Sequence, residues 1–124
     1  MNAIYLDNAA TTALRPEVVD VMTKVLSEQF GNPSSTHSFG RTSKSLLEQC
    51  RKNIAKHFNV SAAEIVFTSG GTEADNLALR SSVRDLGVTE IITTKIEHHA
   101  VLHTAEQLQN EYSVDLKYVE LDDL

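Results

Sequence analysis

A glycine-rich corner between a predicted strand and a predicted helix is the segment of this chain best suited to chemistry. The apolar run 64–68 leads directly into residues 69–76, whose sequence is SGGTEADN. Two glycines let a backbone turn tightly and approach a ligand closely, and the start of the following helix would direct unpaired N–H groups at an anion. The corner predicts a bound anion, such as a cofactor phosphate, although glycine pairs also join strands to helices in α/β proteins that bind nothing there.

The helix that follows the corner has its own start and stop signals. Thr72 and Asp75 fit a capping box, in which Thr72 serves the first amides and Asp75 reaches back. Leu79 and Val83 recur at helical spacing, and Gly87 is the natural end. The corner lacks both the GK[ST] of a Walker loop and the GxGxxG dinucleotide fingerprint, which excludes nucleotide binding of those two kinds.

A second candidate group follows the predicted strand 90–94. Ligands in open α/β sheets collect at the carboxyl ends of strands, and His98 lies there, just before a predicted helix at 99–112. If this strand runs parallel to 64–68, His98 lies at the same sheet edge as the glycine corner. An imidazole at that place suits proton transfer near neutral pH, although a lone loop histidine is also common on protein surfaces.

Two further histidines, His99 and His103, are spaced four residues apart on the same predicted helix. They face away from the stripe that we expect to be buried, which contains Val101, Ala105, Leu108 and Tyr112. Such a pair could bind zinc, but HExxH is absent and no cysteine lies nearby. We expect no metal site.

The elements that must position these residues alternate along the chain. Residues 1–15 read as an N-terminal arm, Pro16 begins a helix that ends before Gly31, and a second helix covers about 41–58. The predicted strands are 64–68, 90–94 and 114–119, with helices between them. This alternation predicts an α/β fold with parallel pairing.

Cysteine content and charge limit the classes of function. The single cysteine, Cys50, shares an apolar stripe with Leu47, Ile54 and Phe58, so we expect it to be buried and inert. A formal net charge of −6 without a basic cluster disfavours nucleic acid as a partner. No apolar stretch approaches the roughly 20 residues of a membrane-spanning helix, and no secretory signal is apparent. We expect the protein to be located in the cytoplasm.

Four motifs in one order together resemble the NifS/IscS-type cysteine desulfurases, and the similarity runs from about residue 4 to the end. They are YLDNAATT at 5–12, FGNPSS at 30–35 followed by His37 and FGR at 39–41, SGGTEADN at 69–76, and EHHAVL at 97–102. The resemblance implies a class V aminotransferase-like enzyme of fold-type I that uses pyridoxal 5′-phosphate (PLP). Such enzymes remove sulfur from L-cysteine, leaving alanine and a persulfide on an enzyme cysteine, and supply iron–sulfur clusters or thio-cofactors.

The resemblance also implies roles for individual residues. Positions that match Gly71 and Thr72 hold the cofactor phosphate, and the histidine that matches His98 stacks on the pyridine ring and assists proton transfer. Residues 8–12 resemble the segment that approaches the substrate. The family implies a homodimer, and the sulfur implies a scaffold or acceptor protein as a further partner.

Three residues that the family needs would lie beyond Leu124: a lysine that binds the cofactor, an aspartate for the pyridinium nitrogen and a cysteine that accepts sulfur. Lys95 and Cys50 do not match these positions. Residues 16–124 would be the first helices and first three strands of an incomplete PLP-binding large domain. We expect the chain to be inactive by itself, with 64–68 lacking a neighbouring strand and the two later strands pairing with each other.

Two other functions are compatible with these residues. One is a selenocysteine lyase or another lyase on the same fold, because the residues that select sulfur chemistry are not in this sequence. The other is an interaction fragment without enzymatic activity.

Overall fold

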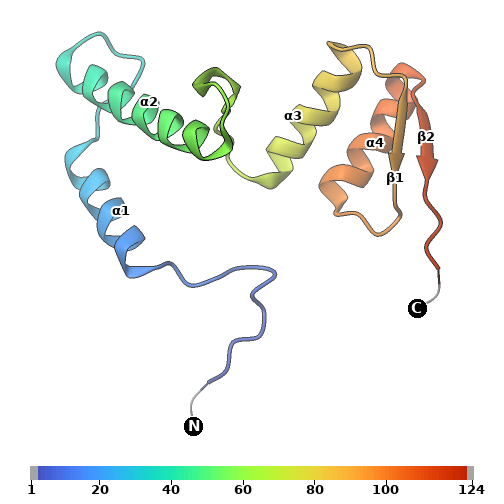
Figure 1. The fold of residues 1–124 in the computed structure, drawn as a ribbon, viewed down its shortest axis with the longest axis horizontal. Helices are drawn as coiled ribbons and strands as arrows, with labels where there is room; N and C mark the ends of the chain where they lie inside the picture. Colours follow the sequence, from blue (N-terminus) through green and yellow to red (C-terminus); the bar gives the residue numbers. More distant parts are fainter. Residues whose placement is uncertain (1–2, 123–124) are drawn as a thin grey trace. The chain divides into compact units, whose positions relative to one another are not determined.

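The computed structural model describes residues 3–122 and divides the chain into two compact units, Met1–Ile65 and Val66–Leu124 (Figure 1). Residues 1–2 and 123–124, the ends of the predicted arm and of the predicted domain, lie outside the described residues. The proposed boundary between an arm at 1–15 and a domain at 16–124 stays a prediction. Among the described helices, none is both long and apolar enough to cross a membrane.

The first unit is helical. It contains α1 (Pro16–Glu28), α2 (Ser38–Phe58) and a single 3₁₀ turn, η1 (Ala62–Glu64). Proline occupies the first turn of α1, where its missing N–H costs nothing. The turn η1 is held by a capping box, in which Ser61 accepts from the Ala63 amide and Glu64 accepts from the Ser61 amide.

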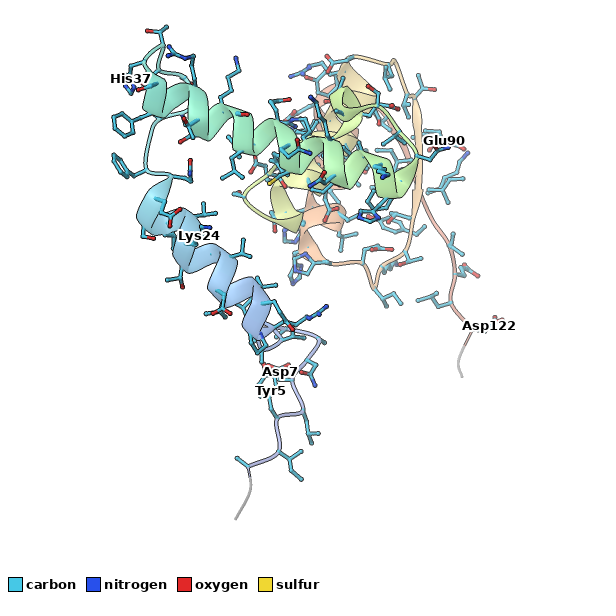
Figure 2. The ribbon with its side chains drawn as sticks, turned by 60° about the vertical axis from the view of Figure 1, so that its left-hand side comes forward. Tyr5, Asp7, Lys24, His37, Glu90 and Asp122 are labelled. Atoms are coloured by element: carbon cyan, nitrogen blue, oxygen red, sulfur yellow. The ribbon has the colours of Figure 1, made fainter. Side chains whose placement is uncertain are left out.

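Helix α2 begins three residues before the predicted start at Arg41. The reason is His37, whose Nδ1 accepts a hydrogen bond from the Gly40 amide at 3.4 Å and so caps the helix; Figure 2 labels His37 at this helix end. Gly40 must be small, because a Cβ there would collide with the Ser35 and Asn32 carbonyl oxygens.

The expectation that Cys50 is buried was wrong, because Cys50 is exposed. Of its stripe, Leu47 and Phe58 are 41% and 72% exposed and Ile54 is half-buried, whereas the buried residues of α2 are Gly40, Ser43 and Ala55. Helical spacing identifies a stripe that is able to be buried, but burial needs a partner element on that face.

The second unit contains the sheet. It consists of α3 (Gly71–Arg84), β1 (Glu90–Thr93), α4 (His99–Tyr112) and β2 (Asp115–Tyr118). The strands β1 and β2 are parallel, and their register pairs Glu90 with Asp115 and Thr93 with Tyr118. Helix α4 is the crossover between them, and its limits are those predicted from the sequence. The pairing of the two later strands is thereby confirmed.

The core of this unit is small and lies between the helices and the sheet. Val83, Leu108 and Val114 form it, with Leu79 and Ile91 packed against them. Leu108 of α4 is fully buried, whereas Tyr112, which was expected on the same face, is 49% exposed. The buried face of α4 is thus rotated slightly from the expected one and includes Ala100, Thr104 and Ala105.

The predicted strand at 64–68 does not form. Ile65 has an extended backbone (φ −94°, ψ 118°), but residues 65–68 pair with no strand in the described part of the chain. A strand is stabilised by hydrogen bonds to a neighbour, so an apolar run that has none stays irregular. This agrees with the expectation that the run lacks a neighbour here.

Apolar side chains are exposed along the described part of the arm and along α1, which has no buried residue. The exposed fractions are 87% for Leu6, 62% for Val21 and 48% for Met22. Contiguous exposed apolar surface favours association. We expect residues 1–124, produced alone, to show a mass larger than that of one chain in light scattering.

Val21→Glu should lower this association, because it places a charge on the apolar face of α1. Thr23→Glu, which adds the same charge at an exposed polar position of that helix, should lower it less. A monomer that melts cooperatively would contradict the prediction.

Candidate functional site

The glycine corner ends in a helix that has no side-chain cap. Helix α3 begins at Gly71, with Gly70 as its N-cap. The predicted capping box was therefore wrong, because the helix begins too early for Thr72 to be its cap. Within the described residues, no acceptor serves the amides of Gly71, Thr72 and Glu73. Free amides at the positive end of a helix dipole are suited to an anion.

The two glycines leave open space beside the backbone. A Cβ added to Gly70 or Gly71 would meet no atom of the described residues within 4 Å. Neither glycine has the positive φ that side chains avoid, since the φ of Gly70, at 166°, is extended backbone. Neither neighbouring atoms nor strain require glycine here. The open space leaves room for an approaching ligand, and this set of donors and this opening fit a phosphate.

One carboxylate already belongs to the corner. Glu73 Oε2 accepts hydrogen bonds from the Ser69 amide and the Ser69 hydroxyl, both at 2.6 Å. These two hydrogen bonds, the hydroxyl first, lower the pKa of Glu73 below its ordinary value. Glu73 therefore makes the side-chain contact back to the preceding residues that was predicted for Asp75. Its carboxylate points toward Ser69 and, through these two hydrogen bonds, holds the loop before α3 in place.

His98 is the N-cap of α4. Its Nδ1 accepts a hydrogen bond from the Ala100 amide at 3.1 Å, and its side chain is exposed. Because the amide is a donor, Nδ1 must be unprotonated in this arrangement, and in the neutral ring the proton is on Nε2. The cap fixes the imidazole at the start of the helix and leaves the Nε2–H as its free hydrogen-bond donor.

The corner and His98 lie at the same end of the second unit. Figure 1 shows α3 and α4 running in the same direction, with their first turns on the side to which the arrow of β1 points. A hydrogen bond from Asn76 Nδ2 to the Ala100 carbonyl oxygen at 3.4 Å joins the two helices. The first turns that carry Gly71, Thr72 and His98 therefore lie at the same end of this unit (Figure 1).

Asn76 was not singled out from the sequence, although a signal was present. It lies three residues before Leu79 and seven before Val83, so it continues the stripe of α3 that packs against the core. A polar residue on an inward-facing stripe needs hydrogen-bond partners. A polar residue at this position of the stripe could have identified Asn76 from the sequence.

The other residues weighed from the sequence lie outside this group. Lys95 Nζ lies 5.7 Å from the centre of the Tyr118 ring. His99 and His103 are exposed, with ring centres 4.9 Å apart. The described residues contain no group of three or more histidine, cysteine, aspartate or glutamate side chains that could hold a metal ion.

Comparison with known proteins gives relatives of one kind. The Aminotransferase class-V family model matches residues 4–124. The chain is 50% identical over 125 residues to the IscS 1 protein of Bacillus subtilis (strain 168), covering 98% of this chain and 32% of that protein. It is 45% identical over 121 residues to the cysteine desulfurase IscS of Dictyoglomus turgidum, covering 96% of this chain and 30% of that protein. The chain therefore spans about a third of the length of these relatives.

Solved structures give the same result. A NifS-like protein matches with a TM-score of 0.79 and 38% identity, over 93% of this chain and 32% of that chain. The structure of SspA in complex with cysteine matches with a TM-score of 0.78 and 32% identity, over 90% of this chain and 32% of that chain. These neighbours confirm the predicted α/β fold-type I class for this part of the protein. The chain belongs to the class-V aminotransferase family, and its relatives there are cysteine desulfurases of the NifS/IscS type.

Proposed function

We propose that the protein carrying this chain is a PLP-dependent cysteine desulfurase. It would convert L-cysteine to L-alanine and leave the sulfur as a persulfide on an enzyme cysteine, for delivery to iron–sulfur cluster or thio-cofactor assembly. Support comes from the cysteine desulfurase relatives and from the structural neighbour SspA, which was solved in complex with cysteine. The carrying observation in this chain is the open, uncapped start of α3 at the same end of the unit as His98 (Figure 1).

In this proposal the corner binds the cofactor phosphate. The free amides of Gly71 and Thr72 donate to phosphate oxygens, and the dipole of α3 favours their negative charge. The Glu73 carboxylate is held by Ser69 and so does not occupy these amides. The chain thereby fixes one end of the cofactor, and PLP, when bound, supplies the electron sink for bond cleavage at the substrate amino acid.

His98 would cover the ring of the cofactor and assist proton transfer there. Its Nδ1 is occupied by the Ala100 amide, so the ring cannot turn freely about its cap. An imidazole held in one place is suited to general acid–base catalysis. Lysine, aspartate and cysteine groups for the remaining steps would come from the part of the protein outside this chain, together with a homodimer and a sulfur acceptor.

The substitution His98→Asn tests the proposed role of the imidazole in proton transfer while keeping a side chain that can cap α4. Asparagine is a good N-cap, so the intact protein should keep its melting temperature. It loses the imidazole, so alanine formation from L-cysteine should fall by a factor on the order of 10² or more in kcat. His98→Ala should lose both the activity and about 1 kcal/mol of stability.

His103→Asn is the matched control for this prediction, since His103 is exposed on the same helix. It should leave both activity and melting temperature unchanged. If His98→Asn retained full activity, the proposed role of His98 would be wrong.

The substitution Gly71→Ala should separate folding from cofactor binding. A methyl group here meets open space and removes a glycine from the helix, so stability should stay the same or rise by up to about 1 kcal/mol. The methyl group would occupy the opening that the phosphate needs, so PLP affinity should fall about tenfold, which corresponds to roughly 1.4 kcal/mol.

The measurement is an absorbance titration of the apo form of the intact protein with PLP. Pyridoxal, which lacks the phosphate, is the control ligand, and its affinity should be unchanged by Gly71→Ala. An equal loss of affinity for both ligands would place the phosphate elsewhere.

A further inference from the structure

One side-chain amide joins the two helices that begin at the candidate site. Asn76 Nδ2 donates to the Thr72 carbonyl oxygen at 2.9 Å and to the Ala100 carbonyl oxygen at 3.4 Å. Asn76 Oδ1 accepts from Thr104 Oγ1 at 2.9 Å and from Arg80 Nε at 3.4 Å. A single side chain therefore contacts α3 before and after itself and also contacts α4.

The chemistry of the partners fixes the orientation of this amide. Carbonyl oxygens only accept hydrogen bonds and a guanidinium only donates them. Nδ2 must therefore face Thr72 and Ala100, and Oδ1 must face Arg80. In a flipped amide, the oxygen would face the two carbonyl oxygens and the NH₂ group would face the guanidinium, so these hydrogen bonds would be lost. The contact thus has one arrangement.

The contacts of Asn76 lead to both halves of the candidate site. Thr72 is the second residue of α3 and belongs to the glycine corner. Ala100 is the residue whose amide is bound by His98 Nδ1 at 3.1 Å. The hydrogen bonds of Asn76 therefore link a residue of the corner to Ala100, the residue whose amide binds the imidazole.

Neighbouring side chains hold Asn76 in place. Thr104 is only 3% exposed, and its hydroxyl lies 2.7 Å from the Ala100 carbonyl oxygen as well as near Asn76. Arg80 reaches α4 beyond Asn76, with a hydrogen bond to Gln107 and an ion pair to Glu111 at 3.6 Å. These contacts limit sliding of one helix along the other.

We propose that Asn76 is a positioning residue that sets the spacing between the phosphate-binding corner and His98. This inference rests on the proposed function, because it concerns a cofactor that contacts both places at once. A ligand that spans two contact points is sensitive to the distance between them, whereas a ligand that uses only one point is not. Loss of Asn76 should therefore lower the affinity for PLP more than the affinity for either pyridoxal or inorganic phosphate.

The experiment compares three ligands in the apo form of the intact protein. PLP and pyridoxal are titrated by absorbance, and inorganic phosphate is measured as a competitor of PLP. In Asn76→Ala, the affinity for PLP should fall about tenfold, as expected for the loss of one to two net hydrogen bonds. The affinities for inorganic phosphate and for pyridoxal should each change less than about twofold.

Two pairs of variants separate positioning from stability. Asn110→Ala removes an exposed asparagine of α4 and should change none of the three affinities. Thr104→Val removes the hydroxyl that faces Asn76 Oδ1 while keeping a branched side chain, and Thr104→Ser restores the hydroxyl. Thr104→Val should show the same selective loss of PLP affinity, and Thr104→Ser should keep the affinity of the unmodified protein. This pair keeps the inference testable if Asn76→Ala does not fold.

Each outcome decides the matter. A selective loss for PLP in Asn76→Ala or Thr104→Val supports the inference. Unchanged PLP affinity, or an equal loss for PLP and inorganic phosphate, overturns it while leaving the proposed function intact. If the unmodified apo protein binds no PLP, the proposed function itself fails and the inference fails with it.

Discussion

The candidate site depends on the packing of α3 against α4. Each helix contributes its first turn, one with free amides and the other with the imidazole that caps it. The contact combines an apolar part, in which Val83 and Leu108 meet, with a polar part around Asn76. Apolar packing is tolerant of small shifts, whereas hydrogen bonds have narrow limits of distance and direction. The polar part therefore defines the alignment of the two helix ends.

The electrostatics of the corner combine a positive helix end with a nearby acid. Glu73 lies in the first turn of α3, where a carboxylate is favoured by the dipole, and its pKa is lowered by the two hydrogen bonds from Ser69. Those bonds turn the carboxylate toward the preceding loop. The amides at the start of α3 remain available to a second anion, so an acidic residue in the motif SGGTEADN is compatible with phosphate binding.

Patterns that act over a few residues were predicted well. Helix 99–112 and the two paired strands were predicted to within about a residue at each end, because helical spacing and short β-branched runs are local signals. Predictions that needed a partner were less successful. The run 64–68 was predicted as a strand and Cys50 as buried, yet the described chain has no neighbouring strand for the first and no covering element for the second. Cap positions were also difficult to predict, since His37 is the N-cap of α2 and Gly70 is the N-cap of α3.

The residue types of the candidate site and the family of the chain can be read from the amino-acid sequence. Gly71, Thr72 and His98 are recognisable because glycine, a helix start and an imidazole have intrinsic chemistry, and because four motifs stand in one order. The way the two helix starts are linked is a property of the folded chain. Asn76 reaches Ala100, whose amide is bound by His98, only because α3 packs against α4. The two residues lie 24 positions apart, so local spacing can mark Asn76 as inward-facing but does not identify its partner on the other helix.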